Sequence, residues 1–336
     1  MTREFPHDLN LLKQKEMTTI ERFLDHLFSL KEFILSILLA MRIIKNWYAL
    51  ILIWLIPKRS IPLKSRIGVS REINCWNEYE LFRDEVYCSI PSIFKPKLNE
   101  LSFHIDDVCT FVYKGRKLTF TKEYLHDSLN MILVVYETFA LEQYKNILLD
   151  PPSQIVDIGA NMGDSSVYFA LNGMDVIAYE PYRKAYLQAV ANFKKNYLDK
   201  SIKIYNAGAG ISHQTNLDFE METRAGQPLV ENPKGSAISI LSFHEIYSAI
   251  DFSKKTSLKI DCEGCEYDFF LNANAEELGK FHSIIGEYHY GYRRLQRKIS
   301  ASGFKVLITT PRSRYNKDSQ TLMITGNFYA FKVENR

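Results

Sequence analysis

The fold of this chain is decided by the stretch "IVDIGANMGDSS", residues 155–166. Its apolar start, interrupted by Asp157, fits a buried strand, and the loop that follows consists largely of glycine, alanine and asparagine. The next run, "DSSVYFALNG", fits a helix in which Asp164 or Ser165 caps the N-terminus and Gly173 ends the last turn. A strand, a loop of small residues and a helix form the unit at which open α/β sheets bind ligands, beyond the carboxyl ends of their strands.

The same alternation of strand and helix continues along the chain. The helix expected at residues 181–198 begins with a proline and repeats apolar residues at helical spacing. An insertion at residues 211–250 contains two strand-like runs, "TNLDFEM" and "AISILSF". Strands are expected at residues 154–159, 175–180, 202–207, 257–262, 283–289, 304–310 and 327–333. This alternation predicts a parallel, doubly wound sheet.

The length of the chain, 336 residues, suggests one large domain with a smaller region beside it. We expect an apolar helical region at residues 1–57, a small β-rich accessory region at 58–130 and the α/β domain at 131–336. In the accessory region, "VCTFVYKGRKLTFTK" reads as two strands around a turn at residues 114–116. This pattern predicts a β-hairpin.

The most apolar part of the chain is residues 33–56. Arg42 and Lys45 lie in the middle of this run, and two central charges cost about 5 to 7 kcal/mol on membrane insertion, which nearly cancels the apolar gain. We therefore predict two helices buried against the protein, with a break near Asn46, and no integral membrane protein. A peripheral helix that contacts the membrane surface through residues 33–56 is the alternative, because the run carries aromatic residues that suit an interface.

Composition limits the class of protein. The chain is 46% apolar and 24% charged, with a net charge of +3, and it has no dense stripe of lysine and arginine, so we expect no nucleic-acid partner. The five cysteines are odd in number and no signal-peptide pattern opens the sequence, which favours a cytoplasmic location.

Cys262 and Cys265 form a C-x-x-C motif without a second pair at zinc spacing. We interpret both as packing residues and predict no metal ligands.

The loop after the first strand has the features of a cofactor site. Gly159 and Gly163 have no side chain, so a ligand can approach the backbone closely, and Ala160 and Asn161 add little bulk. A dinucleotide-binding loop reads G-x-G-x-x-G, whereas this loop reads G-A-N-M-G. Because Asn161 stands where the middle glycine would allow close approach of a pyrophosphate, the loop argues against NAD and FAD. S-adenosylmethionine, which has no phosphate, fits better.

Polar residues at the strand ends suit the same cofactor. Asp157 can accept from an amine, and Glu180, which ends the second strand, can accept two hydrogen bonds from a ribose diol. The third strand ends at Asn206 and Ala207, where an adenine would lie. These four positions complete the predicted cofactor site.

Five motifs in order resemble the FkbM family of S-adenosylmethionine-dependent methyltransferases. They are "VDIGANMGDSSVYFA", "AYEP", "GSAISI", "LKIDCEGCEYDFF" and "GEYH", and the similarity runs from about residue 137 to the C-terminus. The resemblance implies a Rossmann-like class I methyltransferase sheet, with seven strands of which the last is antiparallel. It also implies O-methylation of a hydroxyl on a sugar or glycan precursor.

Carboxylates and a histidine follow the fourth and fifth strands. Asp261 ends the fourth strand, and Glu287 and His289 end the fifth. Methyl transfer to a hydroxyl benefits from positioning and from a base. We predict Asp261 as the base, with Glu287 and His289 as further catalytic or acceptor-binding groups. Two other functions stay open: an NAD-dependent oxidoreductase or epimerase on a similar sheet, and a non-catalytic, membrane-associated binding module.

Overall fold

The computed structural model describes residues 44–51, 60–64, 70–73, 99–104, 108–121, 123–124, 131, 134–140, 142–217, 236–309, 311–316 and 321–332. The chain divides into two compact units, of which the larger contains residues 117–336 and the smaller contains residues 17–103 and 110–116. The domain boundaries expected near residues 57 and 130 stay predictions.

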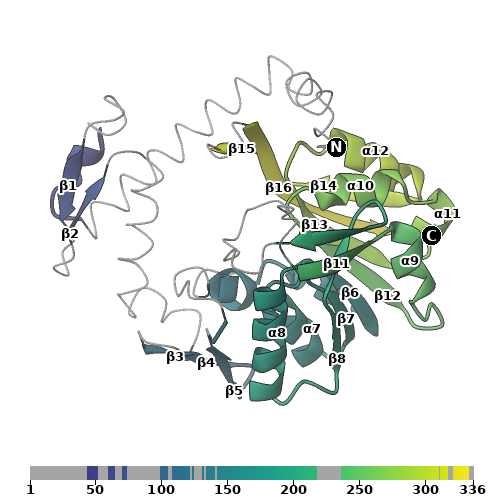
Figure 1. The fold of residues 1–336 in the computed structure, drawn as a ribbon, viewed down its shortest axis with the longest axis horizontal. Helices are drawn as coiled ribbons and strands as arrows, with labels where there is room; N and C mark the ends of the chain where they lie inside the picture. The colour runs from purple at the N-terminus through teal and green to yellow at the C-terminus, as the bar shows by residue number, and fades with distance from the viewer. Residues whose placement is uncertain are drawn as a thin grey trace. The chain divides into compact units, whose positions relative to one another are not determined.

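The larger unit is built on a mixed sheet that follows the predicted alternation (Figure 1). Its main path runs β14-β16-β13-β12-β6-β7-β8, and β15 (Arg312–Asn316) pairs with β16 beside this path. The seven strands of the path are β6 (Gln154–Ile158), β7 (Asp175–Tyr179), β8 (Ile202–Tyr205), β12 (Thr256–Ile260), β13 (Ser283–Tyr288), β14 (Phe304–Ile308) and β16 (Thr321–Lys332).

The order and direction of these strands confirm the expected fold class. Numbered along the chain, the seven strands lie in the order 3-2-1-4-5-7-6. The pairs from β8 to β13 are parallel, and β16 is antiparallel to both β13 and β14. Every residue of β6 and β12 is buried, which places these two strands at the centre of the core. The strand order reverses between them, and the ligand-binding crevice of an open α/β sheet lies at such a point.

Helices connect the strands of the larger unit. They are α7 (Asp164–Leu171), α8 (Arg183–Lys195), α9 (Phe243–Ser248), α10 (Cys265–Leu271), α11 (Ala275–Leu278) and α12 (Arg293–Ala301), preceded by the short helices η1 (Tyr136–Ala140) and η2 (Lys145–Leu149). The predicted side-chain cap of α7 is wrong, because Gly163, with a φ of 86°, stands at the N-cap and the side chains of Asp164 and Ser165 point to other partners.

The insertion forms a small sheet of its own. β9 (Ala207–Ala209), β10 (His213–Leu217) and β11 (Ser236–Leu241) lie in the order β10-β11-β9. The run "AISILSF" is therefore confirmed as β11, and the start of "TNLDFEM" lies in β10, while its residues 218–221 lie outside the described residues. The strand expected at residues 202–207 ends earlier, at Tyr205, because β9 leaves the main sheet and pairs with β11 in parallel.

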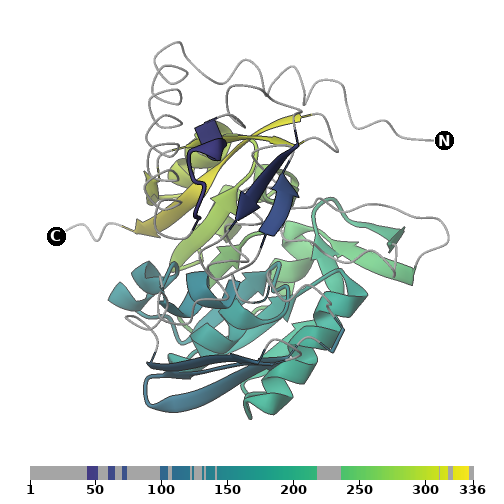
Figure 2. The same cartoon turned by 90° about the vertical axis from the view of Figure 1, so that its left-hand side faces the viewer.

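The predicted hairpin is also confirmed. β4 (Val108–Tyr113) and β5 (Arg116–Thr121) flank a turn in which Lys114 and Gly115 both have a positive φ, and β3 (Asn99–His104) pairs with β4. The C-terminal part of β5 lies beside α8 (Figure 2), where Asn192 and Asn196 accept hydrogen bonds from the backbone of Thr121 and Thr119.

In the smaller unit, β1 (Ile61–Lys64) pairs with β2 (Ser70–Ile73) in an antiparallel ribbon. Asn46 lies in a turn, as expected, and its side chain bonds to the backbone of Pro62 and Lys64. Most of the run at residues 33–56 lies outside the described residues, so its two helices and its membrane contact stay predictions. None of the helices in the described part of the chain combines the length and apolarity that crossing a membrane requires.

Candidate active site

A cavity of about 190 Å³ lies at the carboxyl ends of the central strands. Six of the predicted site residues line it: Gly159, Asn161, Glu180, Ala207, Asp261 and Glu287. The other five predicted residues do not line it: Asp157, Ala160, Gly163, Asn206 and His289. The sheet therefore brings the predicted cofactor loop and the predicted catalytic residues to one place.

The two glycines of the loop make room for the protein itself. A Cβ atom at Gly159 would lie 1.8 Å from the carbonyl oxygen of Asp261, and one at Gly163 would lie 2.4 Å from the ring of Phe193. Both glycines also have a positive φ. We expected the missing side chains to admit a ligand, whereas the positions they would fill are occupied by β12's end and by α8. Gly159 still contributes its backbone to the cavity wall.

Glu180 is fixed by the backbone on both sides. Its Oε2 accepts from the amide of Asn161 at 2.8 Å, and its Oε1 accepts from the amide of Tyr182 at 2.9 Å. Burial raises the pKa of Glu180 to about 7, although these two hydrogen bonds favour the ionised form. Asn161 has a φ of 47°, which turns its own amide toward Glu180. The Oδ1 atom of Asn161 is buried and accepts no hydrogen bond from any residue that the structure describes.

Asp157 lies inside the protein, away from the cavity. Its carboxylate is fully buried, accepts the hydroxyl groups of Ser165 and Ser166 at 2.7 and 2.6 Å, and lies 3.0 Å from the ammonium group of Lys259. We had expected this carboxylate to meet an amine of the ligand. The amine that it meets belongs to Lys259, whose Nζ also donates to the carbonyl of Gly159 at 2.7 Å. Asp157 and Lys259 thus hold the loop between β6 and α7.

Asn206 and Ala207, the two residues that follow β8, have different roles. Ala207 lines the cavity, as predicted. Asn206 instead donates to the carbonyls of Glu180 and Pro181, both at 2.9 Å, so it holds the end of β7. The rings of Tyr179 and Tyr205 stack with their centroids 5.3 Å apart, and Tyr179 lines the cavity. An aromatic surface therefore borders the region where we expected an adenine.

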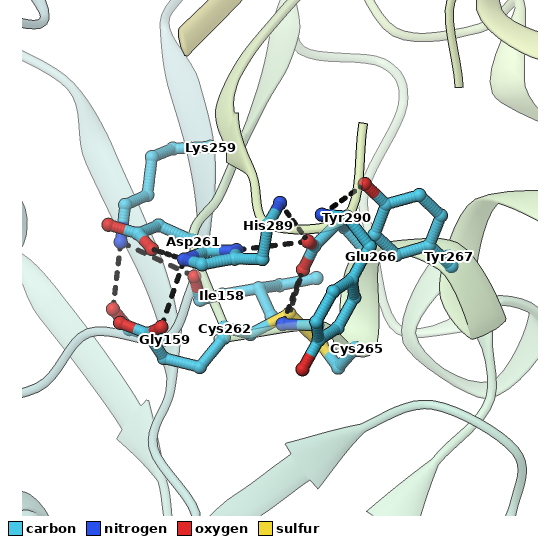
Figure 3. A network of polar contacts seen from close by, with 12 residues as sticks. Ile158, Gly159, Lys259, Asp261, Cys262, Cys265, Glu266, Tyr267, His289 and Tyr290 are labelled. Atoms are coloured by element: carbon cyan, nitrogen blue, oxygen red, sulfur yellow. Dashed lines mark hydrogen bonds and ion pairs between the residues drawn. A yellow bond between two sulfur atoms is a disulfide. The ribbon is translucent and has the colours of Figure 1, made fainter. Parts of the chain in front are cut away.

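The predicted catalytic residues form one cluster, of which Figure 3 shows Asp261 and His289. One ligand atom from each of Asp261, Glu287 and His289 lies within 4.8 Å of the others. Burial, and then the charge of Asp261, raise the pKa of Glu287 to about 8. Burial alone would lower the pKa of His289, but its contacts with Glu266 and Glu263 outweigh burial and hold this pKa well above its usual value.

The turn between β12 and α10, together with the start of α10, holds the side chain of His289 in place. Glu266 is fully buried: its Oε1 accepts from the backbone amide and the Nδ1 of His289, and its Oε2 accepts from the amide of Gly264. Cys262 and Cys265 form a disulfide across this turn. Our interpretation of them as packing residues is therefore wrong, because a C-x-x-C pair that spans a strand-to-helix turn brings its two side chains together.

Lys259 and Asp164 are among the polar residues of the site that sequence reasoning missed. Lys259 lies within the buried strand β12. A lysine in an otherwise apolar strand could have indicated the site, because a buried cation needs a buried anion as its partner. Asp164 lines the cavity and accepts from the hydroxyl of Thr138 at 2.6 Å, and burial raises its pKa to about 7. The sequence gives no comparable signal for Asp164, since its role depends on a contact with η1.

No protein-family model and no curated protein matches the chain. Among solved structures, TYW2 of Pyrococcus horikoshii in complex with MeSAdo is 15% identical, with 84% of this chain and 94% of that chain covered and a TM-score of 0.34. A SAM-dependent methyltransferase from Agrobacterium tumefaciens is 11% identical over 69% of this chain and 72% of that chain, also with a TM-score of 0.34.

A third structure, precorrin-6y C5,15-methyltransferase from Geobacter metallireducens, is 10% identical over 63% of this chain and 94% of that chain, with a TM-score of 0.31. Likenesses of this size assign no activity. The similarity to the FkbM family stays a prediction from the motifs, and the function rests on the geometry of the site.

Proposed function

We propose that this chain is an S-adenosylmethionine-dependent methyltransferase that acts on a hydroxyl group. The observation that carries the proposal is the pair Glu180 and Asn161 at the strand-order reversal of a 3-2-1-4-5-7-6 sheet. Two backbone amides hold the Glu180 carboxylate at the cavity wall, where its remaining lone pairs can accept from a ribose diol. Asn161 adds a buried acceptor, Oδ1, that a ligand amine or hydroxyl would satisfy.

The charge of the cavity supports a cationic cofactor. Among the described residues that line it, six are carboxylic acids and one, Lys259, is a cation. The ammonium of Lys259 is engaged with Asp157 and the carbonyl of Gly159. The carboxyl groups of this wall that are ionised attract the sulfonium and ammonium groups of S-adenosylmethionine and repel the pyrophosphate of NAD.

The catalytic cluster supports an oxygen acceptor. When bound, S-adenosylmethionine supplies an electrophilic methyl group. Glu287, on β13, then holds the acceptor hydroxyl beside the methyl group, and Asp261, at the end of β12, takes up its proton. Burial raises the pKa of Asp261, which strengthens it as a base. The similarity to FkbM proteins supports a sugar or glycan precursor as the source of this hydroxyl.

The proposal is tested by separating binding from turnover in the variant Asp261→Asn. We expect its affinity for S-adenosylhomocysteine to stay within a few-fold of the unchanged protein, because the cofactor rests on Glu180 and Asn161. We expect its rate of methyl transfer from labelled S-adenosylmethionine to a panel of sugar acceptors to fall by about 10² to 10⁴. Full turnover by Asp261→Asn would remove Asp261 from the mechanism, and an equal loss of affinity would reassign it to the cofactor.

A further inference from the structure

One group of side chains in the cavity has the composition and spacing of a metal site. Asp261 lies at the end of β12, and Glu287 and His289 lie at the end of β13, with one ligand atom of each within 4.8 Å of the others. The Nε2 atom of His289 lies 3.9 Å from Oδ1 of Asp261. Ligands of an octahedral ion at about 2.1 Å lie about 3 to 4.2 Å apart, so a small movement of these side chains would suffice to close around a divalent ion.

The orientation of His289 is a separate observation that points to a ligand. Its side chain is 3% exposed, and its Nδ1 lies 2.9 Å from the buried carboxylate of Glu266. Glu266 is held in turn by the backbone amides of His289 and Gly264. Metal-binding histidines are oriented in this way, by a carboxylate on the ring nitrogen that faces away from the metal. The other nitrogen, Nε2, therefore points into the group of carboxylates (Figure 3).

The balance of charge in this corner also fits a cation. Three carboxylates, those of Asp261, Glu263 and Glu287, face a single imidazole there. Lys259, the one cation among the described residues that line the cavity, directs its ammonium to Asp157 and to the carbonyls of Ile158 and Gly159. In this structure Oε2 of Glu263 lies 2.9 Å from Nε2 of His289. That contact occupies the position that a metal ion bound to Nε2 would take.

We propose that Asp261, Glu287 and His289 bind one divalent cation, with Glu263 as an additional ligand. A set of carboxylate oxygens and one imidazole nitrogen suits Mn²⁺. It also suits Mg²⁺ when water molecules fill the remaining positions of its octahedral coordination shell. The role of the ion rests on the proposed function: it would hold the acceptor oxygen beside the cofactor and lower the pKa of that hydroxyl. Binding of the ion itself does not depend on the identity of the cofactor.

The test is a titration of the full chain with Mn²⁺, after treatment with a chelator and its removal, followed by electron paramagnetic resonance. We expect saturable binding of one Mn²⁺ per chain, competed by Mg²⁺. Asp261→Asn and Glu287→Gln should each weaken binding by at least about 10-fold. Glu266→Gln, which disturbs the orientation of His289 and the turn at Gly264, should weaken it by about 10- to 100-fold. Asp268→Asn is the matched control, because it removes an exposed carboxylate of the same helix, α10, and should leave binding unchanged.

Two results would overturn the metal site. One is the absence of saturable Mn²⁺ binding by the unchanged chain, which does not depend on the folding of any variant. The other is equal binding by Asp261→Asn, Glu287→Gln and the control. Titration with S-adenosylhomocysteine in the absence of metal distinguishes failure of the metal site from failure of the proposed function. If the chain binds S-adenosylhomocysteine but not Mn²⁺, only the proposed metal site is wrong. If it binds Mn²⁺ but not S-adenosylhomocysteine, the proposed cofactor is wrong and the metal site stands.

Discussion

At the scale of single residues, the site depends on the buried ion pair of Lys259, which lines the cavity, and Asp157, which does not. The side chains of Lys259 and Asp157 are 2% and 0% exposed, and their charged atoms are 3.0 Å apart. Burial would lower the pKa of Lys259, but Asp157 and Asp261 outweigh it and raise this pKa. Lys259 stays charged, and its ammonium joins β12 to the carbonyls of the loop between β6 and α7. The pair therefore fixes the position of the loop between β6 and α7.

We predict that Lys259→Met lowers the free energy of unfolding by about 3 to 5 kcal/mol, because it leaves the buried charge of Asp157 uncompensated. The measurement is urea unfolding followed by circular dichroism. Lys254→Met is the control: its ion pair with Asp175 is exposed, and its loss should change the free energy by less than about 1 kcal/mol. A Lys259→Met variant as stable as this control would show that the pair does not hold the loop.

The pKa of Glu180 gives a prediction for cofactor binding. Folding raises this pKa from its usual 4.5 to about 7, so the carboxylate destabilises the fold increasingly as pH rises from about 4.5 to 7. Ribose binding needs the ionised form, which is about ten times less populated at pH 6 than at pH 8. We expect S-adenosylhomocysteine to bind about 10-fold more weakly at pH 6 than at pH 8, and calorimetry at both values checks this.

The matched variant for this pH dependence is Glu180→Gln, which does not titrate. Its affinity should be low and nearly equal at pH 6 and pH 8. A second variant, Asp164→Asn, removes the other carboxyl group of the cavity whose pKa is raised to about 7, and it should retain the pH dependence. If Asp164→Asn abolishes the dependence while Glu180→Gln keeps it, the ribose contact at Glu180 is wrong.

At the scale of elements, the turn between β12 and α10 determines how the cluster is presented. Glu263 and Gly264 have φ values of 58° and 117°, and a Cβ atom at Gly264 would lie 2.7 Å from the ring of Tyr290. The disulfide between Cys262 and Cys265 closes this turn. A non-glycine residue at positive φ costs about 1 to 3 kcal/mol, so the disulfide and Glu266 together stabilise a strained backbone beside the reacting groups.

We predict that the disulfide contributes about 2 kcal/mol to stability, the loop-entropy value for so short a loop. Thermal unfolding with and without dithiothreitol measures this contribution. The reductant should lower the midpoint of the unchanged chain, whereas Cys265→Ser should begin at the lower midpoint and show no response. An equal response in both chains would place the effect of the reductant elsewhere in the molecule.

At the scale of the whole molecule, periodicity and turn residues predicted the sheet well. Six strands of the path were expected within two residues of their ends, since apolar runs bounded by turn residues report local structure, whereas β16 begins six residues before the strand expected at residues 327–333. What the sequence did not reveal are contacts between distant segments. The glycines at positions 159 and 163 suggested an approaching ligand, whereas β12 and α8 fill that space. The partner of Asp157 lies on β12, in another part of the chain, and no pattern within the loop indicates it.

The same distinction holds for the site. Position at a strand end correctly placed Glu180, Asp261 and Glu287 at one cavity, because the carboxyl ends of parallel strands meet at one edge of a sheet. The direction of a side chain is not encoded by that rule. Asn206 turns back to the end of β7, and His289 turns to Glu266, because each satisfies a buried hydrogen bond there.

The central claim is that the cavity binds S-adenosylmethionine. It is tested most directly by calorimetry of the purified chain with S-adenosylhomocysteine and, separately, with NADH, at pH 8. We predict saturable binding of one S-adenosylhomocysteine per chain and no heat of binding with NADH. In Glu180→Ala the affinity for S-adenosylhomocysteine should fall by roughly 30- to 1000-fold. Two charge-assisted hydrogen bonds of about 1.5 to 3 kcal/mol each are lost there in part or in full. Binding of NADH without binding of S-adenosylhomocysteine, or an unchanged affinity in Glu180→Ala, would contradict the account.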